Sequence, residues 1–192
     1  MPRTRTFIAI DTGDAIRKQA VALQKQLSRT IPDGVNWTEP TGMHVTLLFL
    51  GEVDDREVVQ VCRAVSAVAR REPAFPLAVS GLGVFPNPRR PKVVWGGVTD
   101  GADDLKRLHA ALEAAMLDLG CYRKEDRAYT PHLTLGRVTD DAAALALAAE
   151  VPKLADWGGG RATVGEVKVY SSELRRAGPE YAVIGRASLA GN

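Results

Sequence analysis

The sequence is poor in the residues that support several common kinds of site. Only two cysteines, Cys62 and Cys121, occur among 192 residues, so the chain cannot build a disulfide framework and has no Cys-x-x-Cys motif. Cys62 shares a predicted helical face with Val58 and Val65, which favours a small core residue. Cysteine use of this kind fits a reducing compartment, and we expect a cytoplasmic protein.

Strong charge and long apolar runs are also lacking. The net charge is +2 and the pI is near 8.6, which is too mild for a chain whose whole field attracts nucleic acid. An anionic partner would have to be held by local clusters of positive side chains. No apolar stretch approaches the length of a membrane span, and the run at 7–10 is too short for a signal peptide. We expect no membrane partner.

Several catalytic motifs are missing too. The sequence has no His-x-His, no His-Glu-x-x-His and no cysteine cluster, so three or four converging zinc ligands are not predicted. It also lacks the Gly-x-Ser-x-Gly elbow of serine hydrolases and the common glycine-rich phosphate loops. The sequence therefore predicts neither a metal nor a cofactor.

A repeated motif stands out against this background. Two of the three histidines begin the sequence His-x-Thr-Leu, at His44 and again at His132. Each motif lies in an apolar run bounded by Gly or Pro, which is typical of a strand. Because strand side chains alternate, His44 and Thr46 leave one face, as do His132 and Thr134. One such motif would be an ordinary strand histidine beside a β-forming threonine, but two favour a functional pair.

The surrounding pattern also occurs twice. Phe7 to His44 spans 37 residues and Val93 to His132 spans 39, while His44 to Phe75 and His132 to Thr163 both span 31. We infer a duplicated β-α-β unit with a pseudo-two-fold axis, in one domain over 1–192. The halves cover about 1–86 and 91–171, divided at the proline-rich junction 86–91, and a closing strand covers 179–190.

The helices are predicted from apolar stripes and caps. Thr12 or Asp14 begins the first helix, Asp54 the second, Asp100 the third, and Asp140 or Asp141 the fourth. The stripe of the first helix is Ile16, Ala20, Leu23 and Leu27. Gly120 ends the third helix in a left-handed conformation, and 158–160 is predicted as a loop.

Two imidazoles can serve as a neutral base and a cationic acid. Such a pair suits the opening of a phosphodiester, in which a nucleophile loses a proton as a leaving oxygen gains one. The hydroxyls of Thr46 and Thr134 would donate to the phosphate oxygens, where charge builds up. His109 lies among apolar helix residues, and we interpret it as structural.

Other residues are candidates for substrate binding. Arg90 belongs to a basic cluster with Arg89 and Lys92, and a second cluster is Arg123, Lys124 and Arg127; each reads equally well as a solvated turn. Strict alternation places Arg137 opposite His132, unless a bulge at Gly136 turns it toward the cleft. Tyr129 or Phe7 would stack a base, although an aromatic residue at a strand end is more often core.

These residues resemble the 2H phosphoesterase superfamily, and within it the RNA 2',3'-cyclic phosphodiesterases historically called 2'-5' RNA ligases, of LigT or ThpR type. The resemblance spans nearly the whole chain and rests on four segments with the family's order and spacing: Arg5-x-Phe7-Ile8-Ala9-Ile10, His44-Val45-Thr46-Leu47 with Phe49-Leu50-Gly51, Val93-Val94-Trp95-x-Gly97, and Pro131-His132-Leu133-Thr134-Leu135-x-Arg137.

The resemblance implies an α+β, bilobed fold with two antiparallel-rich sheets flanking a central cleft and helices outside. It implies metal-independent hydrolysis of RNA 2',3'-cyclic phosphate ends to 2'-phosphates. His132 then corresponds to the base that activates water and His44 to the acid that protonates the 3'-oxygen. Thr46 and Thr134 correspond to phosphate binders, and Arg137 matches the family's arginine after the second motif, which favours a substrate-binding role in the cleft. The expected partners are RNA ends, tRNA-derived ends among them, or small cyclic nucleotides.

Two other functions stay open at this point. The first is 2'-5' RNA ligation, which is the same chemistry in reverse. The second is a non-catalytic module that binds RNA ends or nucleotides, in which the imidazoles only hold phosphate. Arginine holds phosphate better than histidine, so a pure binder would not need a matched histidine pair. We expect a monomer, although no residue pattern sets the oligomeric state.

Overall fold

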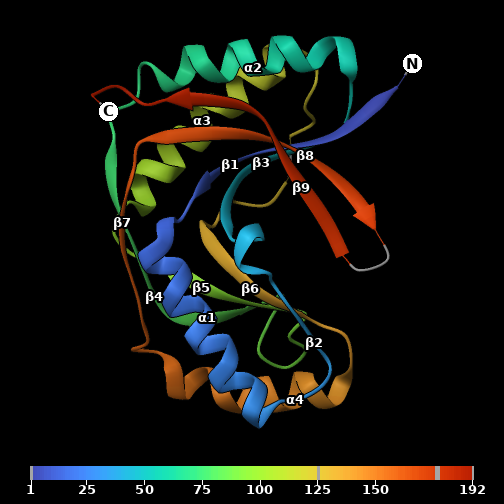
Figure 1. Cartoon of the computed structure of the whole chain (residues 1–192), viewed down its shortest axis with the longest axis vertical. Coiled ribbons are helices and arrows are strands. Elements are labelled where there is room, and N and C mark those ends of the chain that lie inside the picture. The colour runs from blue at the N-terminus through green and yellow to red at the C-terminus, as the bar shows by residue number, and fades with distance from the viewer. Residues whose placement is uncertain (1, 125, 176–177, 192) are drawn as a thin grey trace.

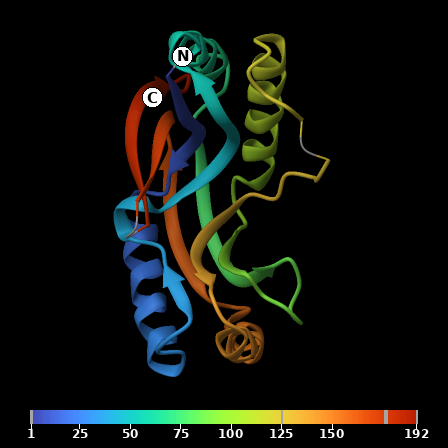
Figure 2. The same cartoon turned by 90° about the vertical axis from the view of Figure 1, so that its right-hand side faces the viewer.

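The computed structural model describes residues 2–124, 126–175 and 178–191. Its chain runs through two antiparallel sheets and four α-helices within these residues (Figures 1 and 2). The elements are β1 (Arg3–Asp11), α1 (Gly13–Thr30), β2 (Val35–Trp37), β3 (His44–Asp54), α2 (Asp55–Ala69), β4 (Phe75–Phe85), β5 (Val93–Val98), α3 (Ala102–Asp118), β6 (His132–Val138), α4 (Asp141–Glu150), β7 (Gly158–Val164), β8 (Glu166–Arg175) and β9 (Gly178–Ser188).

Each sheet contains one of the two motif strands. The motif-1 sheet has the order β3-β1-β8-β9, and the motif-2 sheet has the order β2-β6-β5-β4-β7. Helices α2 and α3 pack against the motif-1 sheet, whereas α1 and α4 pack against strands of the motif-2 sheet (Figure 1). The predicted α+β fold with two antiparallel sheets and helices outside is confirmed. No helix in the described part of the chain is both long and apolar enough to cross a membrane.

The lobes do not coincide with the sequence halves. Strands β4 and β5 pair with each other in the motif-2 sheet, and the junction at 86–91 is the loop of their hairpin. Helix α1 belongs to the first half but packs against β7 of the motif-2 sheet, and α3 of the second half packs against β3. The junction therefore does not separate the lobes. The assignment of 1–192 to one domain remains a prediction.

The duplication is visible in the order of the strands. In one sheet the motif strand β3 is followed by β1 and β8, and in the other the motif strand β6 is followed by β5 and β4. The third strand of each triplet comes from the other half of the chain, because β4 precedes the junction and β8 follows it. Both halves thus contribute to both sheets, which holds the lobes together.

The predicted helical stripe of α1 is confirmed, since Ile16, Ala20, Leu23 and Leu27 are all buried. Two predicted caps are also confirmed. The Asp54 carboxylate accepts a hydrogen bond from the amide of Arg56, and that of Asp140 accepts one from the amide of Ala143. Gly120 has φ +68°, as its predicted left-handed role requires.

Three local predictions were wrong. Thr12 precedes α1 without a side-chain cap, and the Asp11 carboxylate instead accepts from the Gly13 amide at 2.8 Å. Asp100 does not cap α3, because the N-cap residue is Gly101, with φ +80° and no side-chain cap. A Cβ at Gly101 would lie 2.4 Å from the Pro76 carbonyl oxygen, so the position favours glycine. The residues 158–160 begin strand β7 rather than forming a loop. Pairing with β4 overrides the glycine-rich local sequence there.

Candidate active site

Both motif strands bulge at the same point. In β3, Ile8 pairs with Leu48 and Ala9 with Thr46, so Leu47 has no partner. In β6, Val94 pairs with Gly136 and Trp95 with Thr134, so Leu135 is the extra residue. A bulge places two residues opposite one and so reverses the alternation beyond it. The predicted bulge exists, one residue earlier than Gly136, and it brings Arg137 onto the face that carries His132.

The two bulges create matched rows of side chains. The row on β3 is His44, Thr46 and Phe49, and the row on β6 is His132, Thr134 and Arg137. Within each row, the residues that pair with successive members on the neighbouring strand are two positions apart, which is about 7 Å along the strand. The partners are Asp11, Ala9 and Phe7 on β1 for the first row, and Gly97, Trp95 and Val93 on β5 for the second.

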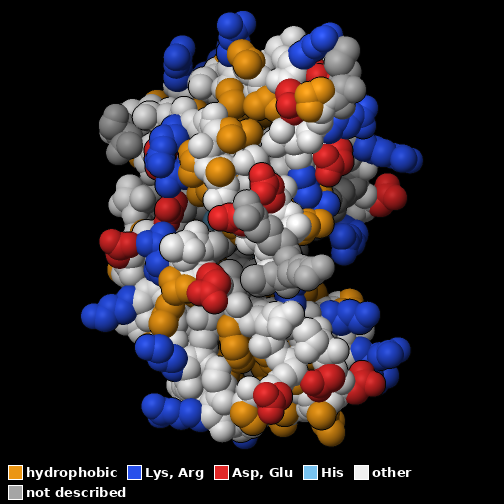
Figure 3. Space-filling model, turned by 45° about the vertical axis from the view of Figure 1, so that its right-hand side comes forward, with side chains coloured by type: hydrophobic (Ala, Val, Ile, Leu, Met, Phe, Trp, Pro, Cys, Tyr) orange, Lys and Arg blue, Asp and Glu red, His pale blue; other side chains and the backbone are white. Residues whose placement is uncertain are grey.

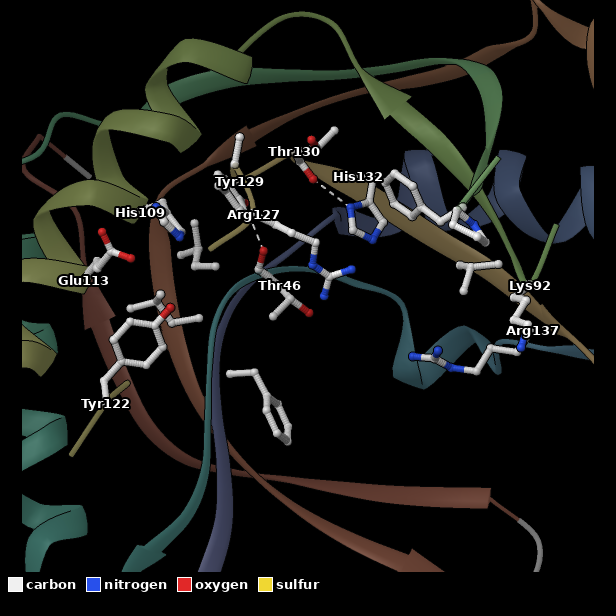
Figure 4. Close-up of a pocket in the computed structure, with 17 residues that line it drawn as sticks. Thr46, Lys92, His109, Glu113, Tyr122, Arg127, Tyr129, Thr130, His132 and Arg137 are labelled. Carbon is white, nitrogen blue, oxygen red and sulfur yellow. Dashed lines mark hydrogen bonds between the residues drawn. The ribbon is translucent and has the colours of Figure 1, made fainter. Parts of the chain in front are cut away.

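A cavity of about 650 Å³ lies at these rows. The space-filling view shows the surface indented between the lobes, with Lys and Arg side chains on both sides of the indentation (Figure 3). Figure 4 shows the side chains of Thr46, Arg127, His132 and Arg137 around a common space. Anionic ligands are favoured there, because Lys92, Arg127 and Arg137 all line the wall.

The sequence-predicted residues are not all in the wall. Thr46, Tyr129, His132 and Arg137 line the cavity, whereas His44 and Thr134 lie on the same strands but are not among its lining residues. Arg90 is exposed in the β4–β5 loop and does not line the cavity. Lys92, from the same basic cluster, lines it in place of Arg90.

Three aromatic rings surround the His44 imidazole. The ring centroids of Phe7, Tyr181 and Tyr170 lie 4.8, 5.4 and 5.9 Å from that of His44. Burial among these rings disfavours the charged form and lowers the pKa of His44 to about 4. A hydrogen bond to the backbone of Gly42 and the charge of Asp11 oppose this effect, and His132 adds to it.

His132 has a similar setting in the other lobe. The rings of Phe85 and Trp95 lie 5.0 and 6.0 Å from it, and its Nδ1 lies 2.7 Å from the carbonyl oxygen of Thr130. Because a carbonyl only accepts, Nδ1 carries the proton, and Nε2 of the neutral ring keeps its lone pair. Burial lowers the pKa of His132, the Thr130 carbonyl opposes this, and the charge of Arg137 lowers the pKa further.

The two imidazoles are equivalent in one further respect. His132 bonds to the backbone of Thr130 and His44 to that of Gly42, each two residues earlier in the chain. The charge of His132 lowers the pKa of His44, and the charge of Arg137 lowers the pKa of both His132 and Tyr181. Since the Tyr181 ring edge contacts His44, these groups from two sheets surround one site.

Comparison with known proteins agrees with this architecture. A family model described as the 2'-5' RNA ligase superfamily matches residues 17–176. The chain belongs to the 2'-5' RNA ligase superfamily. A relative from Methanothermobacter thermautotrophicus, named RNA 2',3'-cyclic phosphodiesterase, is 34% identical over 93% of this chain and 95% of its own.

Solved structures similar to this chain share its whole fold. The crystal structure of TT0787 of Thermus thermophilus matches with a TM-score of 0.84 and 28% identity, over 98% of this chain and 99% of that one. The crystal structure of E. coli LigT complexed with 3'-AMP matches with a TM-score of 0.77 and 25% identity, over 97% and 98% of the two chains. The superfamily fold thus includes both sheets of the present protein.

The sequence leaves Tyr129 and Phe7 open between stacking a base and lying in the core, and the structure places the two differently. Phe7 is 3% exposed and packs against both His44 and Tyr170, so it is a core residue and cannot stack a base. Tyr129 lines the cavity, but one face of its ring stacks on His109 at 4.2 Å. Its hydroxyl donates to the carbonyl oxygen of Thr46 at 2.9 Å. Tyr129 thus ties the segment before β6 to the motif-1 strand within this superfamily fold.

Sequence reasoning missed the aromatic walls of both imidazoles. Tyr170 and Tyr181 come from the last two strands, and Phe85 comes from the end of β4, so no local pattern connects them with the motifs. One signal was available at Gly83. A Cβ there would lie 2.2 Å from Cζ2 of Trp95, so glycine is required for the indole to lie across β4 beside His132.

Asp11 was missed as well. It lies opposite His44 in the β1–β3 ladder. Burial would raise the pKa of its carboxyl, but the Gly13 amide and the nearby Lys168 and Arg17 hold that pKa below its usual value. The Lys168 ammonium is 3.1 Å from one carboxylate oxygen and the Arg17 guanidinium 2.8 Å from the other. A fixed negative charge therefore lies beside the motif-1 imidazole.

Proposed function

We propose that the protein hydrolyses 2',3'-cyclic phosphate ends of RNA to 2'-phosphomonoesters by paired-histidine acid–base catalysis. The observation that carries the proposal is the matched pair of imidazoles. His44 and His132 occupy equivalent positions on two bulged strands of two sheets, close enough for the charge of His132 to lower the pKa of His44. General acid–base chemistry on a phosphodiester requires two such groups in complementary protonation states.

In the proposed reaction, Nε2 of His132 accepts a proton from water as the water oxygen forms a bond to phosphorus. The bond between phosphorus and the 3'-oxygen breaks, and protonated His44 supplies the proton that the 3'-oxygen needs. The 2'-oxygen keeps its bond to phosphorus, so the product is a 2'-phosphate with a free 3'-hydroxyl. Charge on the phosphate oxygens is stabilised by the Thr46 and Thr134 hydroxyls and the Arg137 guanidinium.

The hydrogen bond of His132 is compatible with the role of a general base. Because Nδ1 donates to the Thr130 carbonyl oxygen, the neutral ring has an unprotonated Nε2, which is the form a general base requires. The choice of His132 as the base and His44 as the acid rests on the resemblance to the 2H phosphoesterases, because His44 makes the equivalent hydrogen bond to the backbone of Gly42. The chemistry agrees with the name RNA 2',3'-cyclic phosphodiesterase carried by the Methanothermobacter relative.

The test is product analysis with a nucleoside 2',3'-cyclic phosphate and a short RNA with the same end, in the presence of EDTA. A 2'-phosphate product is expected from both. His44→Gln and His132→Gln should each reduce turnover by about a hundredfold or more, the usual contribution of a positioned acid or base. Leu145→Ala is the control, since it removes a side chain on α4 that is 76% exposed and does not line the cavity, and it should retain the turnover.

Other results of this product analysis would contradict the proposed reaction. Binding without turnover, with the histidine variants losing affinity, would replace the enzyme by a nucleotide-binding module. A 3'-phosphate product would mean that the 2'-oxygen, and not the 3'-oxygen, is the leaving group. The superfamily name favours one second activity, 2'-5' ligation, in which a 5'-hydroxyl attacks the cyclic phosphate in place of water. High concentrations of both RNA ends should then give a joined product that the same two histidine variants fail to make.

A further inference from the structure

The two motif imidazoles have different neighbours across their ladders, although their backbone hydrogen bonds are equivalent. His44 lies directly opposite Asp11 on β1, whereas His132 lies opposite Gly97 on β5. Side chains of directly opposite residues leave the same face of a sheet, with Cβ atoms about 4.5–5.5 Å apart. The carboxylate of Asp11 therefore accompanies His44 on the cleft face, and the corresponding position beside His132 has no side chain.

Three donors fix the Asp11 carboxylate. One oxygen accepts hydrogen bonds from the Gly13 amide and the Arg17 guanidinium, both at 2.8 Å, and the other oxygen lies 3.1 Å from the Lys168 ammonium. Lys168 comes from the neighbouring strand β8 and is 8% exposed. Although burial opposes ionisation of Asp11, these donors hold the pKa of its carboxyl below the usual value. The negative charge is thus present, and fixed in place, at neutral pH.

The other titratable groups around His44 do not supply a negative charge near pH 7. Tyr170 of β8 and Tyr181 of β9 contact its ring, and burial raises the pKa of both phenols, so they stay neutral. From the other sheet, the charge of His132 lowers the pKa of His44. Among the charged side chains of the described residues that act on His44, Asp11 is the one that favours its protonated form.

Burial and Asp11 act on His44 in opposite directions. Burial among the aromatic rings is the larger effect and lowers the pKa of His44 to about 4. A base needs a neutral imidazole, which burial favours, whereas an acid needs a protonated imidazole, which burial penalises. Burial also lowers the pKa of His132, and the charge of Arg137 lowers it further. The charged neighbours thus favour a proton on His44 and disfavour one on His132.

We propose that Asp11 is a positioning residue for the reaction, and that its carboxylate, fixed opposite His44, stabilises the protonated imidazole that supplies the proton to the 3'-oxygen. The inference rests on the proposed function for the role of His44. A bound phosphate anion also favours the charged imidazole, so Asp11 and the substrate act together on one ring. Lys168 moderates the effect, because its positive charge offsets part of the field of Asp11.

The pKa of His44 can be measured directly, because the chain has only three histidines. NMR titration of the free protein follows their ring protons, and the variants His44→Gln and His132→Gln assign the signals, since each lacks one of them. Asp11→Asn keeps the size of the side chain and one acceptor oxygen but removes the charge. It should lower the pKa of His44.

Lys168→Met is the opposite change, since it removes a cation that pairs with Asp11, and it should raise the pKa of His44. Asp14→Asn is the matched control. Asp14 also pairs with Arg17, but its side chain is 98% exposed, and its loss should leave the titration unchanged. Shifts of opposite sign separate electrostatics from folding, because a merely structural ion pair would weaken both variants without moving the pKa in opposite directions.

The same variants should change the reaction in opposite ways. With a nucleoside 2',3'-cyclic phosphate at pH 7, Asp11→Asn should lower kcat by about tenfold, the size of effect typical of an opposite charge beside an ionisable group. The falling limb of its kcat profile should move to lower pH. Lys168→Met should move that limb to higher pH, and Asp14→Asn should keep the profile of the wild type.

An unchanged pKa of His44 in Asp11→Asn would overturn the proposal, and so would shifts of the same sign in Asp11→Asn and Lys168→Met. A kcat profile that stays in place while the pKa of His44 falls would also refute it. If Asp11→Asn does not fold, the rise expected in Lys168→Met decides. If the wild-type protein hydrolyses no cyclic phosphate, the proposed function fails, and the titrations still show whether Asp11 stabilises the protonated form of His44.

Discussion

Leu47 and Leu135 are the extra residues of two equivalent bulges, each directly after a His-x-Thr sequence. Both side chains are buried in the core, at 2% and 0% exposure. Each leucine holds its bulge by packing inward, and the residue two positions later turns to the cleft face as a result. The bulges therefore decide which chemical groups accompany the histidines, with Phe49 beside one and Arg137 beside the other.

The close contact between Gly83 and Trp95 predicts a sharp steric effect. Gly83→Ala would bring a Cβ to 2.2 Å from the indole ring and displace the wall of His132. Overpacking of this kind costs about 1–3 kcal/mol, and turnover should fall with it. Urea denaturation and steady-state kinetics measure both effects. Gly158→Ala is the matched control in the same sheet, because a Cβ there meets no atom within 4 Å. Equal behaviour of the two variants would contradict the packing argument.

Burial of His44 predicts a loss of stability on acidification. Its pKa is about 4 in the folded protein and 6.5 for the free side chain, so the unfolded chain binds the proton first. The stability is present above pH 6.5 and is lost as the pH falls toward 4, by roughly 3 kcal/mol in all. His44→Gln lacks this titration. Its free energy of unfolding should decline less between pH 7 and pH 4.5 than that of the wild type, and parallel declines would refute the prediction.

Neutral histidines in the free protein predict an acidic optimum for kcat/KM. Burial lowers the pKa of both His44 and His132, so raising the pH above 6.5 removes the one protonated imidazole that the reaction needs. A bound phosphate anion favours the charged imidazole and should move the kcat profile to higher pH. Rate measurements from pH 4.5 to 9 test this. A kcat/KM that rises between pH 6.5 and 8 would be incompatible with it.

Arg137→Gln should have two separable effects. Loss of a charge-assisted hydrogen bond to phosphate should raise KM by about tenfold or more. Loss of the nearby positive charge should also raise the pKa of His132, which Arg137 lowers, and shift the corresponding limb of the pH profile upward. Arg90→Gln should affect KM much less, because Arg90 does not line the cavity. If Arg90→Gln matched Arg137→Gln in KM, the hairpin loop would have to reach the substrate.

The sequence predicted the elements of the fold more accurately than their assembly. The apolar stripe of α1 and the caps at Asp54 and Asp140 depend on residues close in sequence, and these predictions are confirmed. The junction at 86–91 looked like a divider of lobes but is a hairpin loop. Whether a turn joins two paired strands or two separate units depends on pairing across the whole chain, which local composition does not encode.

For the candidate site, too, the sequence predicted some features and not others. The paired motifs singled out His44, Thr46, His132 and Thr134, whose catalytic and binding roles remain predictions. Arg90 was predicted to bind substrate because it lies in a basic cluster, yet Lys92 of that cluster is the residue that lines the cavity. Adjacent side chains of a loop differ in direction, and direction is set by how the loop closes.

The sequence by itself determined the chemistry available to this protein: two imidazoles, each two residues before a hydroxyl, in two strands of repeated context. Strand periodicity is a local property, so it could be read from the chain alone. Only the tertiary structure decided which residues surround that chemistry. The bulges turn Phe49 and Arg137 toward the cleft, and the last strands bring Tyr170 and Tyr181 to His44. The contacts of Tyr170 and Tyr181 with His44 join residues far apart in sequence, and they exist because β8 and β9 follow β1 in the motif-1 sheet.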